Sequence, residues 1–504
     1  ENPFPAVCGR ICNRRCEDAC TRGTVDQAVA IDEVKRFIAQ QDLDAATRFV
    51  PEKVIPKVDG EFDQQIAIIG GGPAGLSCAY YLAEKGYRPT VFEKEQRLGG
   101  MLENGLPSFR LEKDVVQAEI DVLREMGVQF RCGVEVGKDV TIAQLRQEGF
   151  RGFYVAVGLQ SGGKLDIPGG DAQGVMAGID FMRQVNGGQC SKLAGPVVVI
   201  GGGNIAADVA RTAVRCGAES VDLYCLEGYD EMPMGAEDRS ECERDGITIH
   251  AGWGQTEIVT ENGHAAGIRF RKCLRVKDDQ GRFAPVFDDN DACEAACATV
   301  LYCIGQKVDW RQLLTGTAVT FNPNGTAQVD PVTYQTAEPD IFAGGDAVTG
   351  QKFAIDAIAA GKEGAISLHR FVQKATLTIG RNRRRFVELD KENALIPVGF
   401  DNTPRQRIGY NEALRRTFRD ERVAFTAEQV QKETARCLSC GASVVDPNKC
   451  IGCGVCTTKC AFDAIHLHRE RPECTNMIPS EDKMKAILPY MVKRQIKIRK
   501  AGRK

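Results

Sequence analysis

The sequence predicts an α/β protein that contains two separate βαβ units with parallel strands. Two segments, residues 64–93 and 195–227, each run from an apolar strand through a glycine-rich loop and a helix to a second strand. The length of 504 residues leaves room for several domains around them. Ten of the 21 cysteines lie in two short clusters near the ends of the chain, which predicts further, smaller domains there.

Composition excludes several functions. The formal net charge is −3, so the chain as a whole has no electrostatic basis for binding nucleic acid. No run of about 18 apolar residues is present, which argues against a transmembrane helix. With five histidines in 504 residues, chemistry dominated by histidine is not expected.

The first βαβ unit carries a dinucleotide-binding pattern. Residues 64–69 form an apolar strand, and Gly70, Gly72 and Gly75 follow in the G-x-G-x-x-G register. Glycines at these places let the backbone turn tightly and approach a pyrophosphate at the helix N-terminus, where amide dipoles favour an anion. The second strand ends at Glu93, which is placed to bond a ribose hydroxyl. This ordered combination predicts a Rossmann-type dinucleotide site.

The second βαβ unit repeats this pattern with one change. Gly201 and Gly203 are in register, and Ala206 stands at the position of the third glycine, where alanine is an accepted variant. The second strand is expected to end near Glu227. An arginine there would pair with the 2′-phosphate of NADP, whereas an acid repels that phosphate and bonds a 2′-hydroxyl. The sequence therefore favours NADH, and NADPH is the alternative.

Two dinucleotide loops in one chain predict two nucleotides that meet. A nicotinamide and a flavin make chemical sense of this pairing, because a hydride passes directly between them, so we expect FAD in the first site. Segments that support a flavin follow the first acidic strand end, close the first domain, and precede a helix that begins near residue 353. The N-terminus of that helix would stabilise negative charge on a reduced flavin. The candidate residues in these segments are Gly99, Gly100, Gly158, Gly345 and Asp346.

The C-terminal cysteines predict an iron–sulfur cluster. Disulfides suit small secreted chains, and zinc ribbons use two separated C-x-x-C pairs. Here Cys450, Cys453, Cys456 and Cys460 form one C-x2-C-x2-C-x3-C run, which is the pattern of bacterial ferredoxins that hold [4Fe–4S] clusters. Ala461 replaces the proline that usually follows such a run.

A second cluster is predicted from the neighbouring cysteines. In ferredoxins with two clusters, the fourth cysteine of each run serves the other cluster. Cys437 and Cys440 could then complete one cluster and begin another, with Cys474 as a possible last ligand. We expect at least one [4Fe–4S] cluster and predict two or more.

Nearly the whole chain resembles the small subunit of glutamate synthase and its relatives, which include the flavin half of dihydropyrimidine dehydrogenase and bifurcating transhydrogenases. The stretches that carry the resemblance are NPFPAVCGRIC, IIGGGPAGLSCAYYLAEKGY, FEKEQRLGGML, NGLPSFRL, VVVIGGGNIAADVAR, EMPM, CIGQ, IFAGGDAVTG and AIAAGKEGA. The resemblance implies a glutathione-reductase-like pair of domains, with FAD in the first and NAD(P)H in the second. It also implies electron transfer to iron–sulfur clusters in a helical N-terminal domain.

The resemblance further implies which residues bind these groups. In the N-terminal domain it points to Cys12, Cys16 and Cys20 as cluster ligands, but not to Cys8. The cysteine run that relatives carry upstream is missing and the chain opens at Glu1, so we expect a fragment, a processed product or one part of a split polypeptide. The positions that contact FAD in the family correspond to Gly70, Gly72, Gly75, Glu93, Gly100 and Asp346, and those of the nicotinamide-nucleotide loop to Gly201, Gly203 and Ala206.

Together these features predict an order of domains. The basic tail at the end could dock a partner, lie on a membrane surface or be structural. The expected order is a partial helical iron–sulfur domain (residues 1–60), the first half of an FAD-binding domain (61–190), an NAD(P)H-binding domain (191–305), the second half of the FAD-binding domain (306–375), a linker (376–436), a ferredoxin-like [4Fe–4S] domain (437–470) and the tail (471–504).

The predicted function is that of a flavoprotein subunit in a multi-subunit electron-transfer complex. Such an oxidoreductase would pass electrons between NADH, FAD and [4Fe–4S] clusters to a partner redox subunit or a ferredoxin, or in the reverse direction. No acid–base side chain is required, so we expect no catalytic residue. Oxygen-sensitive clusters and the lack of an export segment suggest the cytoplasm.

Three other functions compete with this prediction. The ferredoxin-like segment argues against the small subunit of glutamate synthase, which stays an alternative. A non-catalytic assembly subunit with a degenerate flavin site is a second alternative, and the intact glycine loop argues against it. A disulfide reductase would need a redox C-x-x-C or C-x4-C pair beside the flavin, and no such pair follows Gly75.

Overall fold

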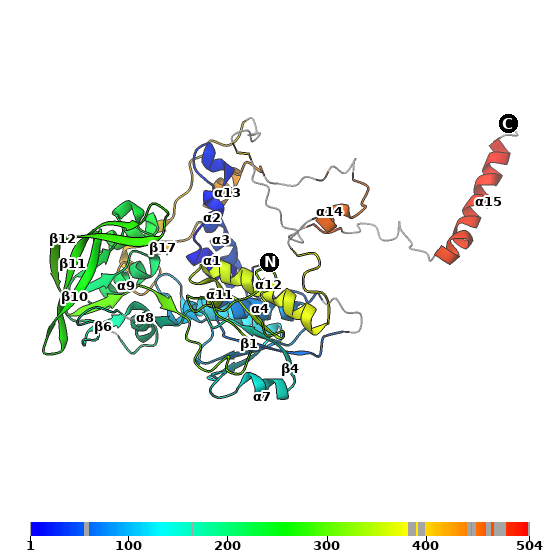
Figure 1. The fold of residues 1–504 in the computed structure, drawn as a ribbon. Coiled ribbons are helices and arrows are strands. Elements are labelled where there is room, and N and C mark those ends of the chain that lie inside the picture. Colours follow the sequence, from blue (N-terminus) through cyan, green and yellow to red (C-terminus); the bar gives the residue numbers. More distant parts are fainter. Residues whose placement is uncertain are drawn as a thin grey trace. The chain divides into compact units, whose positions relative to one another are not determined.

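In a computed structural model, the structure describes residues 2–54, 60–163, 165–190, 192–381, 390–391, 399–440, 445, 450–459, 465–467 and 480–501. The chain divides into two compact units. The larger unit comprises Glu1–Arg381 and Glu388–Cys440, and the smaller comprises Asn382–Val387 and Gly441–Lys504. Figure 1 colours the elements of both units in chain order.

The first α/β domain of the larger unit is built on a five-stranded parallel sheet with the order β15-β4-β1-β2-β3. Apolar runs such as QIAII are buried, as expected for a parallel sheet covered on both faces. The chain leaves this sheet after its fourth strand and returns to it much later, at β15. The strands are β1 (Gln65–Ile69), β2 (Thr90–Glu93), β3 (Gln129–Cys132), β4 (Phe150–Val155) and β15 (Ile341–Ala343).

Two helices of this domain, α4 (Pro73–Glu84) and α12 (Ala354–Val372), lie along each other (Figure 1). Their close approach requires glycine, because a Cβ atom at Gly361 would lie 2.3 Å from the carbonyl oxygen of Ala74. The apolar side chains between these helices and the sheet form the main core of the domain. The remaining helices are α5 (Met101–Asn104), α6 (Lys113–Glu125), α7 (Ile142–Gln147) and α11 (Asp346–Thr349).

The second α/β domain has its own parallel sheet, with the order β6-β13-β7-β8-β9. The chain passes between the domains twice, through β5 (Ser161–Gly162) and β14 (Gln306–Lys307), which pair with each other. Two parallel sheets with helices confirm the predicted fold class. The elements are β6 (Val175–Ala177), α8 (Gly178–Asn186), β7 (Val197–Ile200), α9 (Asn204–Arg215), β8 (Val221–Cys225), η2 (Tyr229–Glu231), α10 (Ala236–Arg244), β9 (Thr248–Ala251) and β13 (Thr299–Tyr302).

An antiparallel sheet that the sequence did not predict is inserted into the second domain. It consists of β10 (Trp253–Glu261), β11 (His264–Lys277) and β12 (Phe283–Ala296). Aromatic stacking joins it to the parallel sheet, since the rings of Tyr224 and Phe270 lie 4.0 Å apart between centroids.

The N-terminal segment (residues 2–54) is helical, and a later part of the chain returns to it. Residues 399–440, here called the strap, run beside this segment, with α13 packed on α3 (Figure 1). Thr426 is the N-cap residue of α13, and its hydroxyl and Gln429 form a capping box. The elements are α1 (Pro5–Ile11), α2 (Arg15–Asp18), η1 (Thr21–Thr24), α3 (Ile31–Leu43), β16 (Gly409–Tyr410), η3 (Glu412–Leu414), β17 (Arg422–Val423) and α13 (Ala427–Ala435).

In the smaller unit the structure describes α14 (Val455–Lys459), η5 (Ser480–Asp482) and α15 (Lys483–Ala501). Every side chain of α15 is exposed. Among the helices of the described residues, none combines the length and the apolar character needed to cross a membrane.

Candidate functional site

A cavity of about 1500 Å³ lies within the larger unit and touches both glycine-rich loops. From the first domain it is lined by the loops that follow β1, β2, β4 and β15, and from the second domain by the first turn of α9. The N-terminal segment also reaches its wall. Of the residues predicted from the sequence, the cavity is lined by Gly70, Gly72, Glu93, Gly100, Gly158, Gly203, Gly345, Asp346 and Cys12.

The first glycine loop has the close packing that its pattern requires. Gly70 has a φ of +109°, and a Cβ atom there would lie 2.4 Å from the carbonyl oxygen of Ala156. Gly75 does not line the cavity, but a Cβ atom on it would lie 2.0 Å from the carbonyl oxygen of Gly70. Gly75 therefore lets α4 begin directly against the end of β1, which is the third glycine's role in such a loop.

Glu93 lies at the end of β2 and holds the same loop. Its carboxylate accepts hydrogen bonds from the backbone N–H of Gly71 at 2.7 Å and of Glu95 at 2.9 Å. Burial raises the pKa of Glu93 above its usual range, while these two N–H groups act in the opposite direction. A buried carboxylate beside the loop is suited to accept a hydrogen bond from a ribose hydroxyl.

A second pair of glycines completes the wall opposite the loop. The N–H of Gly99 donates to the carbonyl oxygen of Gly71 at 2.8 Å. Gly100 has a φ of +56°, and a Cβ atom there would lie 2.9 Å from the Cα atom of Gly72. The two glycine segments therefore pack backbone against backbone beside this part of the cavity. Because these glycines carry no side chains, room is left for a pyrophosphate.

The segment after β15 forms another side of the cavity. Gly345 has a φ of +69° and directly precedes α11. Burial raises the pKa of Asp346 to about 6, although the backbone N–H of Lys352 donates to its carboxylate. Helix α12 begins at Ala354, which also lines the cavity, so its N-terminus faces the site as the sequence predicted near residue 353. The size, the glycine backbone and this helix terminus together fit a bound FAD.

The second glycine loop has a related geometry. Gly201 has a φ of +141°, and its N–H donates to the carbonyl oxygen of Tyr224 at 2.9 Å. Gly203 is the N-cap residue of α9 and lines the cavity, whereas Ala206 is fully buried in the helix packing. These residues fit a nucleotide whose pyrophosphate lies at the start of α9.

Glu227 lies just beyond β8, which ends two residues earlier, at Cys225. A Cβ atom at Gly202 would lie 2.8 Å from the Oε2 atom of Glu227. The corresponding distance between a Cβ atom at Gly71 and the Oε2 atom of Glu93 is 3.1 Å. Glu227 does not line the cavity itself, but both carboxylates lie beside the middle glycine of their loops.

The predicted cluster ligands of the larger unit differ in their exposure. Cys12 and Cys20 are half-buried, while Cys16 and the pair Cys437 and Cys440 are exposed. In the smaller unit Cys450, Cys453 and Cys456 are exposed, and Cys460 lies outside the described residues. Across the part of the chain that the structure describes, no three Cys, His, Asp or Glu side chains are arranged to hold a metal ion.

Several charged residues at the cavity were not predicted from the sequence. Arg14 and Arg15 extend from the N-terminal segment, and Arg15 forms an ion pair with Asp356 at 3.0 Å, in the first turn of α12. Arg110 and Asp208 line the cavity from the first and second domains. Arg110 belongs to the stretch NGLPSFRL, which carries part of the family resemblance. That stretch could have pointed to Arg110, but its pattern alone assigns no role to this residue.

The fold and the shared cavity define an NAD(P)H-dependent oxidoreductase with a flavin and iron–sulfur domains. The chain belongs to the pyridine nucleotide-disulphide oxidoreductase family, which matches residues 64–361. Residues 1–47 match the domain described as dihydropyrimidine dehydrogenase domain II, 4Fe-4S cluster, and residues 443–466 match a 4Fe-4S binding domain. These findings confirm the predicted family and class of enzyme.

Two curated relatives are named as subunits of redox enzymes. The chain is 35% identical to NADP(+)-dependent formate dehydrogenase subunit beta of Moorella thermoacetica, over 86% of this chain and 65% of that protein. It is 31% identical to NAD-dependent dihydropyrimidine dehydrogenase subunit PreT of Escherichia coli O157:H7, over 74% of this chain and 83% of that protein. The chain thus spans less than two thirds of the first relative's length.

Among solved structures, FprA from Mycobacterium tuberculosis shares the fold. The similarity has a TM-score of 0.53 and 18% sequence identity, and it covers 62% of this chain and 85% of that protein. A further structure of FprA, in complex with NADPH, matches with the same TM-score at 17% identity and the same coverage.

Proposed function

We propose that this chain is the flavoprotein subunit of a multi-subunit electron-transfer complex, which takes electrons from NADH onto FAD and passes them through iron–sulfur clusters to a partner redox subunit or a ferredoxin. The observation that carries the proposal is the single cavity that joins both glycine loops. Two nucleotides bound at these loops would share one cavity. Their rings could then approach each other without leaving the protein.

The residues of the first site have distinct tasks. When bound, FAD would supply the acceptor for a hydride, so that NADH is oxidised to NAD+ and the flavin gains two electrons. Gly70, Gly72 and Gly100 would hold its pyrophosphate through backbone contacts, and Glu93 its ribose. The N-terminus of α12 would stabilise negative charge on the reduced ring, and Asp346 would lie on the same side of the cavity.

Glu227 supports NADH over NADPH in the second site. Its carboxylate lies at Gly202 in the way that the carboxylate of Glu93 lies at Gly71. A negative charge at this place repels a 2′-phosphate and accepts a hydrogen bond from a 2′-hydroxyl. The names of the two relatives above include one NADP-dependent and one NAD-dependent enzyme, so the names alone favour neither nucleotide.

The iron–sulfur part of the proposal rests on the cysteine spacing and on the two 4Fe-4S domain matches. The ligands we propose are Cys12, Cys16, Cys20, Cys437, Cys440, Cys450, Cys453, Cys456 and Cys460. Relatives named as subunits of formate and dihydropyrimidine dehydrogenases support a partner redox subunit. A cytoplasmic location is the matching proposal for an oxygen-sensitive enzyme.

Cofactor analysis and steady-state kinetics test this function. Protein purified without oxygen should release FAD rather than FMN and contain iron and acid-labile sulfide in equal amounts. It should reduce a one-electron dye faster with NADH than with NADPH at equal concentration. Protein that holds zinc, lacks flavin or oxidises only NADPH would contradict the corresponding part of the proposal.

A further inference from the structure

We infer that Arg110 is a positioning residue that fixes the second α/β domain against the first and so sets the approach of the nicotinamide to the flavin. The inference rests on the proposed function, because it concerns the hydride transfer between the two nucleotides. Arg110 lies in a loop of the first domain, and this loop is outside the glycine and cysteine motifs.

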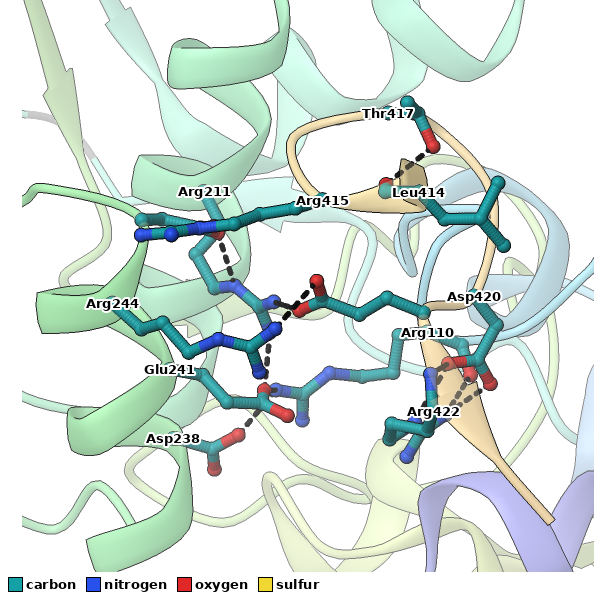
Figure 2. A network of polar contacts seen from close by, with 12 residues as sticks. Arg110, Arg211, Asp238, Glu241, Arg244, Leu414, Arg415, Thr417, Asp420 and Arg422 are labelled. Carbon is teal, nitrogen blue, oxygen red and sulfur yellow. Dashed lines mark hydrogen bonds and ion pairs between the residues drawn. The ribbon is translucent and has the colours of Figure 1, made fainter. Parts of the chain in front are cut away.

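The guanidinium group of Arg110 crosses from one domain to the other. Arg110 follows α5 in the first domain, yet its partners are carboxylates of the second domain. Its Nε atom lies 2.8 Å from Asp208 of α9, and its Nη2 atom pairs with Asp238 and lies 3.8 Å from Glu241, both of α10. Figure 2 shows Arg110 extending toward Asp238 and Glu241.

The contact between Arg110 and its carboxylate partners is largely buried, which makes it specific for one arrangement of the two domains. The side chain of Arg110 is 16% exposed and that of Asp208 is 6% exposed. Desolvated charges must be matched by opposite charges, because an unpaired charge in such a place is strongly unfavourable. Another arrangement of the two domains would leave Arg110 and these carboxylates unmatched, so the pairing favours one arrangement over others.

The neighbouring residue strengthens the same contact. The ring of Phe109 lies under the guanidinium groups of Arg215, at 3.9 Å, and of Arg211, at 4.9 Å, both on α9. Arg211 in turn pairs with Asp245 at 2.8 Å. Phe109 and Arg110 together therefore place an aromatic ring and a cation against the same helix of the second domain.

The strap holds the backbone of Arg110 from the other side. Arg422 of the strap donates from Nη2 to the carbonyl oxygen of Arg110 at 2.9 Å, and its own guanidinium pairs with Asp420 at 2.9 Å. Figure 2 shows Arg422 and Asp420 next to Arg110, on the side away from Asp238. The loop is thus held in place while its side chain reaches the second domain.

The contact lies close to the proposed chemistry. Arg110 and Asp208 line the same cavity as Gly72 and Gly203. Asp208 follows Asn204, the first residue of α9, by about one helical turn, or roughly 6 Å along the axis. A shift of Asp208 therefore carries the second glycine loop with it. Misplacement by about 1 Å can slow a transfer step roughly 100-fold.

The test compares Arg110→Gln and Arg110→Lys with Arg269→Gln. Arg269 pairs with Glu257 and Glu294, both at 2.9 Å, but on the exposed antiparallel sheet, so it is a matched control. Flavin reduction is followed by anaerobic stopped flow at saturating NADH, together with FAD content, the melting temperature and the charge-transfer absorbance of the nicotinamide–flavin pair. Hydrogen exchange of residues 204–215 is measured without any nucleotide.

We expect Arg110→Gln to retain FAD and to slow flavin reduction roughly 10- to 100-fold, with an apparent Kd for NADH within about threefold of the wild-type value. Its charge-transfer absorbance should weaken and exchange in α9 should rise. Arg110→Lys should recover part of the rate, and Arg269→Gln should match the wild type. Asp208→Asn combined with Arg110→Gln should be no slower than Arg110→Gln alone.

An Arg110→Gln protein with wild-type reduction rate, charge-transfer absorbance and exchange would overturn the inference. If the glutamine variant does not fold, a lysine variant that matches the wild type in all three measurements would overturn it equally. If the wild-type flavin is not reduced by either nucleotide, the proposed function fails instead. The exchange of α9 then still decides whether Arg110 fixes the domain.

Discussion

Glu93 and Glu227 occupy corresponding places in the two βαβ units. Glu93 is the last residue of β2, Glu227 lies two residues beyond β8, and each places a carboxylate oxygen beside the middle glycine of its loop. We propose the same requirement, a hydrogen-bond acceptor for a ribose hydroxyl, for both carboxylates. On this proposal the preference for NADH over NADPH depends on the carboxylate of Glu227.

Replacing Glu227 by alanine tests this role. Loss of a charge-assisted hydrogen bond of about 1.5–2 kcal/mol should raise the KM for NADH roughly 10- to 30-fold, with kcat nearly unchanged, and should narrow the preference for NADH over NADPH. Steady-state kinetics with both nucleotides measures this. Glu261→Ala, an exposed acid of the same domain, should behave as wild type. An unchanged ratio between the nucleotides in Glu227→Ala would argue against the assignment.

Glu119 is a buried carboxyl group that is hydrogen-bonded to the N-terminal segment. It accepts hydrogen bonds from the backbone N–H groups of Ala6, at 2.9 Å, and Val7, at 3.3 Å, and burial raises its pKa from 4.5 to about 7. Because this pKa is higher in the folded than in the unfolded chain, its contribution to stability is complete below pH 4.5 and is lost as the pH rises through 7. The loss is about 3 kcal/mol at most.

We therefore expect α1 to open more easily at pH 8 than at pH 6 and Glu119→Gln to abolish this difference. Hydrogen exchange of residues 5–11, corrected for the intrinsic rate at each pH, measures it. Asp121→Asn, an exposed position on the same helix, should keep the wild-type dependence. A glutamine variant with the same pH dependence as the wild type would show that Glu119 is not the group responsible.

At the site, the glycines of the first loop could be predicted from the sequence. Gly70 and Gly75 are identified by spacing, because a Cβ atom at either position would lie within 2.4 Å of a carbonyl oxygen. Arg110 could not be found this way, because its partners Asp208 and Glu241 lie about 100 residues or more away along the chain. An ion pair between domains leaves no periodic signal in the sequence.

At the scale of elements, the crossing of α4 and α12 determines how the first site is enclosed. Gly361→Ala would place a Cβ atom 2.3 Å from the carbonyl oxygen of Ala74, and Ala74 lines the cavity. We expect this variant to lose about 1–3 kcal/mol of stability and part of its FAD, as measured by melting temperature and flavin content. Gly23→Ala, where the nearest atom to a Cβ is 3.8 Å away, should do neither. Full FAD content in Gly361→Ala would mean that the helices adjust without affecting the site.

The sequence predicted the strands and helices of both βαβ units because apolar runs, glycine loops and helix periodicity coincide there. The predicted strand end at Glu227 falls two residues beyond Cys225, where β8 ends. The antiparallel sheet of β10, β11 and β12 was not predicted, since its half-exposed strands carry many polar residues and show no continuous apolar run. Short-range patterns of apolar and polar residues therefore do not distinguish such exposed strands from loops.

At the scale of the larger unit, the strap is held by buried charges. Glu433 and Arg436 pair at 2.7 Å with both side chains inaccessible to solvent. Glu433 also accepts from the N–H of Ala30 at 2.8 Å, and Arg22 donates to the carbonyl oxygen of Arg436 at 2.9 Å. The strap and the N-terminal segment therefore depend on each other, directly before Cys437.

Glu433→Ala removes the buried carboxylate that pairs with Arg436 and leaves it only the half-exposed Asp26 at 3.1 Å as an ion-pair partner. We expect a loss of about 3–5 kcal/mol in the stability of this contact and faster hydrogen exchange throughout residues 399–440. Lys432→Ala, which removes an exposed ion pair with Glu428 on the same helix, should change exchange little. If Glu433→Ala exchanges like the wild type in the strap, these charges do not hold it.

Anaerobic titration with NADH, followed by absorbance and EPR, tests whether one chain joins a nicotinamide site, a flavin and iron–sulfur clusters. We expect NADH to bleach the flavin absorbance and a reduced-cluster EPR signal to grow with it. Protein whose flavin absorbance stays unchanged with excess NADH and NADPH, or whose flavin bleaches with no cluster signal, would contradict the proposed function.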